Sequence, residues 1–212
     1  MFRTLFLASM LVLTGCTTAY YAAMEKVGFH KRDILIDRVE EARDAQLESQ
    51  EEFKDALDQL SQLIRFHGGD LQTRYEALSA QYEDSKKAAA EVSSRISKVE
   101  TVAFDLFAEW ETELSQYQNK QLRTESKKKL LETKRQFDAL VRVMRRAESK
   151  MPPVLRVLND NVLYLKHNLN AKAVGAIQGE FGMLQQDVNN LVAEMNRAIA
   201  ESNQFIAAIN QQ

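Results

Sequence analysis

The single cysteine of the chain, Cys16, is the residue with the most clearly defined chemistry. It follows Leu13, Thr14 and Gly15, and no other cysteine occurs in the 212 residues. A thiolate is a strong nucleophile, and small neighbours give a processing enzyme access to the adjacent peptide bond. Because one cysteine cannot form a disulfide within the chain, the position points to modification of the thiol rather than to cross-linking.

The residues before Cys16 have the pattern of an export signal. Arg3 supplies a positive charge and residues 5–13 are nearly all apolar, as in secretory signals with an apolar stretch of about 7–15 residues. Leu13-Thr14-Gly15-Cys16 resembles the bacterial lipobox, in which the thiol receives diacylglycerol and the chain is cut before the cysteine. This resemblance implies a signal peptide over 1–15. A plain signal peptide with an unmodified cysteine is the alternative.

Lipid on Cys16 would place the protein in the cell envelope. Several acyl chains on one residue give lasting anchorage, whereas a single chain binds a membrane only marginally. Thr17 follows the cysteine, and a residue other than Asp there resembles lipoproteins sorted to the outer membrane and facing the periplasm. Residues 16–29 are interpreted as the lipidated cysteine and a short tether.

No residue pattern indicates catalysis. His30, His67 and His167 are far apart and stand near predicted helix ends, and the sequence has no HExxH motif, glycine-rich phosphate loop or nucleophile elbow. We therefore expect no catalytic residues, no metal site, no cofactor and no enzyme activity. The net charge of −2 gives no reason to expect binding to nucleic acid.

Three of the seven glycines, Gly175, Gly179 and Gly182, would share one face of a helix. Glycine inside a helix costs about 0.5–1 kcal/mol relative to alanine, so close packing should offset that cost. The three residues are a candidate helix-contact notch. Either another helix of this chain approaches there, or a partner does.

Charge is distributed unevenly. Residues 119–150 hold eleven basic and four acidic side chains, whereas residues 100–118 hold five acids and no base. A basic arm over 119–150 would suit anionic lipid or an acidic partner. The alternative is that these cations pair with acids on neighbouring helices.

The elements that position these residues are predicted to be long helices. Glycine and proline are rare, at seven and two residues, and apolar residues recur with the seven-residue spacing of coiled coils. The sequence predicts an all-α fold, an elongated antiparallel coiled coil or helical bundle, forming one domain over 30–212. Its centre is one very long helix over 71–149, ended by Pro152-Pro153. A turn near position 119, giving a compact four-helix bundle, is the alternative.

Two segments carry a family resemblance: Tyr20 to Gly28 with Lys31 to Leu35, and Tyr164 to Ala171. They resemble a family of uncharacterised bacterial helical lipoproteins, a domain of unknown function. That resemblance implies a helical envelope protein and transfers no site residues. The leading hypothesis is a non-enzymatic, lipid-anchored scaffold with an envelope protein or a second copy as partner. The alternative is a membrane- or lipid-interacting protein that uses the basic arm.

Overall fold

A computed structural model describes residues 30–65 and 70–211 of the chain. Four helices make up nearly all of this part: α2 (Lys31–Ile64), α3 (Leu71–Leu114), α4 (Lys120–His167) and α5 (Ala171–Asn210). No strand occurs among the described residues. The all-α prediction is confirmed. Cys16, the signal peptide over 1–15, the tether over 16–29 and His67 lie outside the described residues.

The apolar spacing of the sequence explains which face of each helix is buried. In α2, the residues that follow the seven-residue spacing, at alternating steps of four and three, are all buried, so that one helix face stays toward the core. The same holds along α5 from Leu184 to Ile209. The buried seam of α2 consists of Leu35, Val39, Ala42, Gln46, Ser49, Phe53, Ala56, Leu60 and Leu63.

The predicted single helix over 71–149 is wrong. Helix α3 ends at Leu114 and α4 begins at Lys120. The Ser115 hydroxyl donates a hydrogen bond of 2.7 Å to the Thr112 carbonyl, and the Asn119 side chain accepts hydrogen bonds from two backbone N–H groups at the start of α4. These two caps close a turn without glycine or proline, so the alternative of a turn near position 119 and four helices was the better prediction.

Pro152-Pro153 was expected to end a helix, but both prolines lie inside α4. Their rings remove backbone donors for the carbonyls of Glu148 and Ser149, one turn earlier. Both prolines, and Ser149, are exposed, so water can solvate the carbonyls on this side. The chain instead turns at 168–170, where the Asn170 side chain accepts a hydrogen bond of 3.1 Å from the Ala173 N–H.

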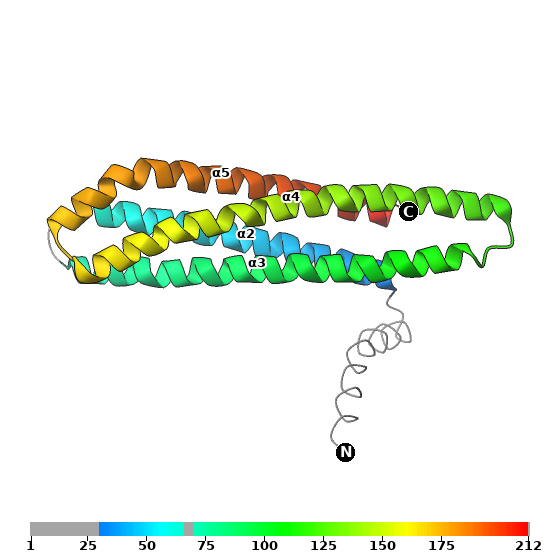
Figure 1. Cartoon of the computed structure of the whole chain (residues 1–212), viewed down its shortest axis with the longest axis horizontal. Helices are drawn as coiled ribbons and strands as arrows, with labels where there is room; N and C mark the ends of the chain where they lie inside the picture. The colour runs from blue at the N-terminus through cyan, green and yellow to red at the C-terminus, as the bar shows by residue number, and fades with distance from the viewer. Residues whose placement is uncertain (1–29, 66–69, 212) are drawn as a thin grey trace, which may run out of the picture.

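The four helices form an up-and-down bundle. Each helix packs against its neighbours in sequence, and α5 also packs against α2, which closes the ring and leaves α2 and α4 at opposite corners (Figure 1). One continuous apolar core runs through the bundle. At 1.5 Å per residue, α4 is about 70 Å long, so the molecule is an elongated bundle rather than a longer two-helix rod. None of its described helices is long and apolar enough to span a bilayer.

Candidate functional site: the open end and the basic face of α4

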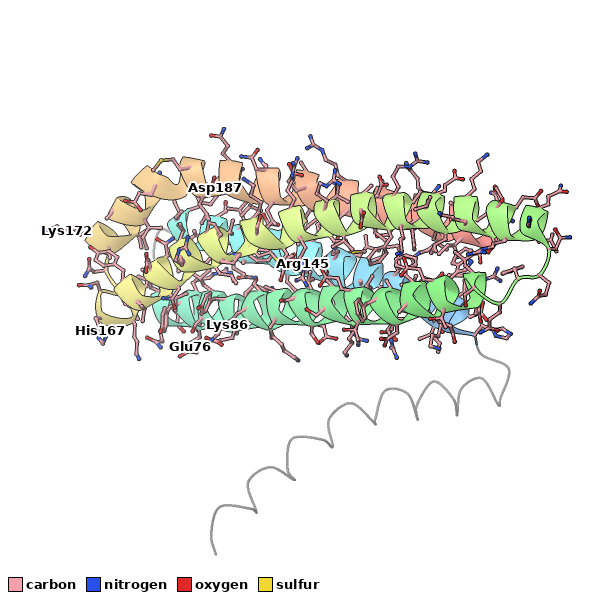
Figure 2. The ribbon with its side chains drawn as sticks, turned by 45° about the vertical axis from the view of Figure 1, so that its right-hand side comes forward. Glu76, Lys86, Arg145, His167, Lys172 and Asp187 are labelled. Carbon is pink, nitrogen blue, oxygen red and sulfur yellow. The ribbon has the colours of Figure 1, made fainter. Side chains whose placement is uncertain are left out.

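The bundle has two different ends. At the far end, His167 and Lys172 flank the turn between α4 and α5 (Figure 2). At the other, the Lys31 Nζ atom lies 2.7 Å from a carboxylate oxygen of Glu109, which places the start of α2 beside the last turns of α3. The α3–α4 hairpin projects beyond the start of α2 (Figure 1). We call this end of the bundle the open end; α2 begins there, after His30.

A hollow of about 340 Å³ lies at the open end, where residues of all four helices meet. An aromatic cluster packs beside it: the rings of Phe107 and Phe137 are 5.5 Å apart, and those of Phe137 and Phe205 are 6.0 Å apart. The hollow is lined by apolar and charged side chains together: Arg32, Leu106, Glu109, Trp110, Glu113, Tyr117, Ser126, Lys129, Thr133 and Ile209.

The polar contacts in this hollow are structural in character. The Trp110 indole donates a hydrogen bond of 2.8 Å to the Ser126 hydroxyl, which joins α3 to α4. Glu109 is engaged by Lys31. Neither arrangement pairs a nucleophile with a base that would activate it. In residues 30–65 and 70–211, no group of three histidine, cysteine or acidic side chains is placed to hold a metal ion.

The predicted basic arm becomes the outward side of α4. Leu130, Phe137 and Met144 mark the core side of the helix, and exposed cations recur on the opposite side at helical spacing. We call this surface the basic face; its cations are Lys120, Arg123, Lys127, Lys128, Arg135, Arg142, Arg146 and Lys150. It extends for about 45 Å from the open end.

Part of the predicted arm is neutralised by α3. Lys134 lies 2.5 Å from Glu111. Arg145 forms ion pairs with Glu100 and, at 2.8 Å, with Glu148. The hydrogen bond that Arg145 donates to Glu100 is the main reason that the pKa of Arg145 is raised above its ordinary value, and Glu148 adds to this effect. The alternative interpretation, pairing with acids on neighbouring helices, therefore describes Lys134 and Arg145.

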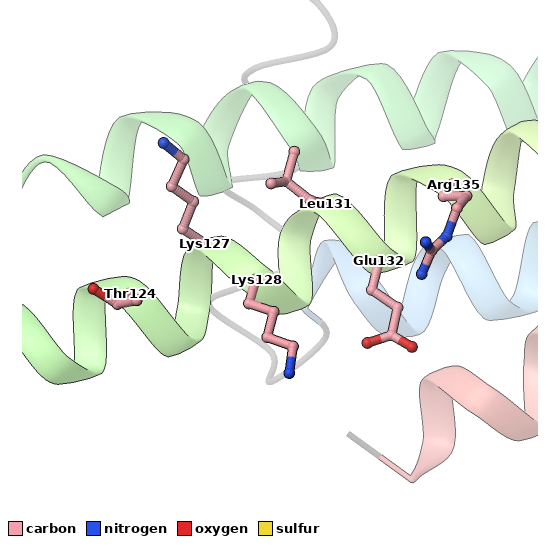
Figure 3. A pocket seen from close by; sticks show the side chains of 6 residues that line it. All are labelled: Thr124, Lys127, Lys128, Leu131, Glu132 and Arg135. Atoms are coloured by element: carbon pink, nitrogen blue, oxygen red, sulfur yellow. The ribbon is translucent and has the colours of Figure 1, made fainter.

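The cations of the basic face differ from these two. Within the part of the chain that the structure describes, none of the eight forms an ion pair. Lys127, Lys128 and Arg135 line a shallow hollow of about 380 Å³ on the surface of α4, together with Thr124, Leu131 and one acid, Glu132 (Figure 3). The Leu131 side chain is 58% exposed. The basic face therefore carries an excess of cations over the exposed acids of the same stretch of α4, Glu125, Glu132 and Asp138, with an apolar group among its charges.

The three glycines of the candidate notch do not pack against another helix of this chain. Gly175, Gly179 and Gly182 are exposed on α5, and apart from adjacent residues and the backbone of α5 itself, no described atom would lie within 4 Å of a Cβ atom built on any of them. Close approach by another helix of the chain does not explain them. Contact with a separate partner stays a prediction.

The two histidines that the structure describes, His30 and His167, lie at opposite ends of the bundle. His30 is the N-cap residue of α2, and His167 is the exposed last residue of α4, at the far end. The Trp110–Ser126 contact was missed from sequence because Ser126 lies in a polar stretch that gave no sign of a partner. The one-position slip of the apolar repeat between Tyr117 and Leu130 is compatible with the predicted single helix and did not by itself identify this contact.

One family model matches most of the chain. The model described as "Protein of unknown function (DUF2959)" matches residues 20–209, which include all of the helices α2 to α4 and nearly all of α5. No curated protein matches the sequence. The chain belongs to the DUF2959 family, whose function is unknown.

Proposed function

We propose that the protein is a lipid-anchored, non-enzymatic structural component of the cell envelope. In this proposal, diacylglycerol on Cys16 holds it in the outer membrane, and the bundle faces the periplasm. The observation that carries the proposal is the entry of the chain at the open end, at His30. Residues 16–29 span at most about 50 Å when extended, so the anchor keeps the open end near the membrane.

The shape of the bundle supports a structural role. Its core is continuous over four helices of 34 to 48 residues, and such packing makes an elongated body whose long sides are available for contacts. The exposed backbone at Gly175, Gly179 and Gly182 is the surface at which a partner helix would approach most closely. An envelope protein or a second copy would use that surface.

Metabolic palmitate labelling tests the anchor. The unchanged protein and a Thr17→Ala control should both incorporate label, whereas Cys16→Ala should not. Equal labelling of the Cys16→Ala variant would refute the anchor. Crosslinking of the native protein in membranes tests the structural role, which predicts recovery of a specific partner that Gly179→Val loses. If crosslinking repeatedly recovers no specific partner, the scaffold role is wrong.

A further inference from the structure

Two opposite sides of the bundle carry opposite charge. The basic face lies on α4, and α2 stands at the diagonal corner. The outward side of α2 presents exposed acids along most of its length: Asp37, Asp44, Glu48, Glu51, Asp55 and Asp58. This charge separation gives the molecule a preferred orientation in an electric field, with α4 toward negative charge and α2 away from it.

We infer that the basic face of α4 binds the phosphate headgroups of anionic phospholipids, so that α4 lies against the membrane and α2 faces away. The eight cations of that face have no ion-pair partner among the described residues. They are therefore available to headgroups without breaking an ion pair among the described residues. Leu131, exposed among them, can enter the interfacial region, as apolar side chains of surface-bound helices do.

The position of the tether favours this docking. The basic face begins at the open end, where the chain enters the bundle, and it continues along α4. An anchor at that end keeps the membrane within reach, which raises the effective concentration of headgroups at the basic face. In this respect the inference rests on the proposed anchor. The affinity of the face for lipid does not depend on Cys16 and can be measured without it.

A second copy of the chain is a weaker occupant than a membrane. The acidic side of α2 would complement the basic face of α4 in a neighbouring molecule. Exposed ion pairs between proteins gain little, however, because both partners are solvated and screened. A basic side chain near an anionic membrane gains roughly fivefold in binding, since many headgroups gather around it. The membrane is therefore the occupant that the charges favour.

Vesicle binding tests the inference directly. The protein starting at residue 16 and carrying Cys16→Ser is mixed with phosphatidylcholine vesicles that contain or lack phosphatidylglycerol. The basic-face variant replaces Lys127, Lys128, Arg135 and Arg142 by Gln. The control variant makes the same charge change elsewhere, at exposed lysines of α3, the far end of α4 and the start of α5: Lys87, Lys98, Lys166 and Lys172. Circular dichroism melts establish that each variant is folded.

The unchanged basic face should bind only the vesicles with phosphatidylglycerol, and more weakly as salt rises. The basic-face variant should bind at least about tenfold more weakly, and the control variant within about twofold of the parent. An equal loss in both variants would overturn the inference, as would absence of binding at about 0.1 M ionic strength. Sedimentation velocity adds a third refuting result: self-association that needs the basic face, without vesicle binding, would make a second copy the occupant.

These results are separate from the test of the anchor. If Cys16→Ala abolishes palmitate labelling but the protein does not bind anionic vesicles, the proposed anchor stands and the inference about the basic face is wrong. The reverse holds for a protein that binds anionic vesicles through the basic face but never carries lipid.

Discussion

Gln46 should limit the stability of the bundle. Its side chain is fully buried at a core position of α2, and neither its amide nitrogen nor its amide oxygen has a hydrogen-bond partner among the described residues. The hydroxyl of Ser49, one turn on, also lacks a described partner. A buried polar group without a partner costs about 1–3 kcal/mol. The substitution Gln46→Met keeps the unbranched shape and removes the polar atoms.

The expected gain follows from that cost. The free energy of unfolding should rise by about 1–3 kcal/mol on Gln46→Met, since the removed amide group no longer has to be desolvated. For a domain of this size, each kcal/mol raises the Tm by about 2–4 °C. Urea unfolding at pH 7, followed by circular dichroism, measures the change.

Gln50 provides the matched control, one turn further along the same helix. Its amide nitrogen donates a hydrogen bond of 2.9 Å to Asn196, and its oxygen accepts one of 3.0 Å from Lys54. Gln50→Met should therefore lower stability, by about 0.5–1.5 kcal/mol for each lost bond. If Gln46→Met left stability unchanged or lowered it as Gln50→Met does, the amide of Gln46 would be satisfied and the reasoning wrong.

Three further perturbations test separate parts of the structure. Burial alone would raise the pKa of Glu41. The hydrogen bond and charge of Arg38, together with those of Arg95 on α3, nevertheless hold that pKa below its ordinary value. The stabilisation from Glu41 is therefore present above the ordinary pKa and lost as pH falls through the folded-state pKa; Glu41→Gln should destabilise the bundle at pH 7 and make no difference in strong acid, as urea melts at both pH values would reveal. A double-mutant cycle on Arg145 and Glu100 should give a coupling of about 0.5–1 kcal/mol that weakens with salt, because the pair is partly exposed; zero coupling at low salt would contradict the ion pair. Gly179→Ala should raise the Tm, by an amount equivalent to about 0.5–1 kcal/mol, since its Cβ meets no described atom; a loss of stability would mean that a helix does approach there.

The sequence was sufficient to predict the helical class and the buried faces. Residues such as Leu35, Phe53 and Leu60 are fully buried, as their spacing in α2 predicts. The reason is that helical periodicity is set locally, and any packing partner must accept the same apolar face. The polar middle of this seam, including Gln46, was also visible in the sequence.

The connections between helices were less predictable. Asn119 and Ser115 stop and restart the helix by hydrogen bonds of single side chains, and such residues also occur on exposed helix surfaces. Pro152 and Pro153 lie inside α4 with their side chains exposed, a setting in which water can solvate carbonyls of the preceding turn. That exposure depends on which side of α4 meets α3 and α5, and this is a tertiary property that the local sequence does not contain.

The candidate site could be predicted only in part, because it too depends on how the helices pack. The excess of cations over 119–150 was evident, but their pairing was not. Lys134 and Arg145 have acidic partners on α3, whereas Lys127 and Lys128 do not. Which cations find partners depends on the register of α3 against α4, and that register follows from the turn at 115–119.

The intact mass of the N-terminal peptide tests the central claim most directly. The native protein is extracted from membranes with detergent and digested, and the peptide containing Thr17 is measured by mass spectrometry. Lipid anchorage predicts that this peptide begins at Cys16 and carries a diacylglycerol thioether on the sulfur. A mature chain that begins elsewhere, or a Cys16 with an unmodified thiol, would contradict the claim.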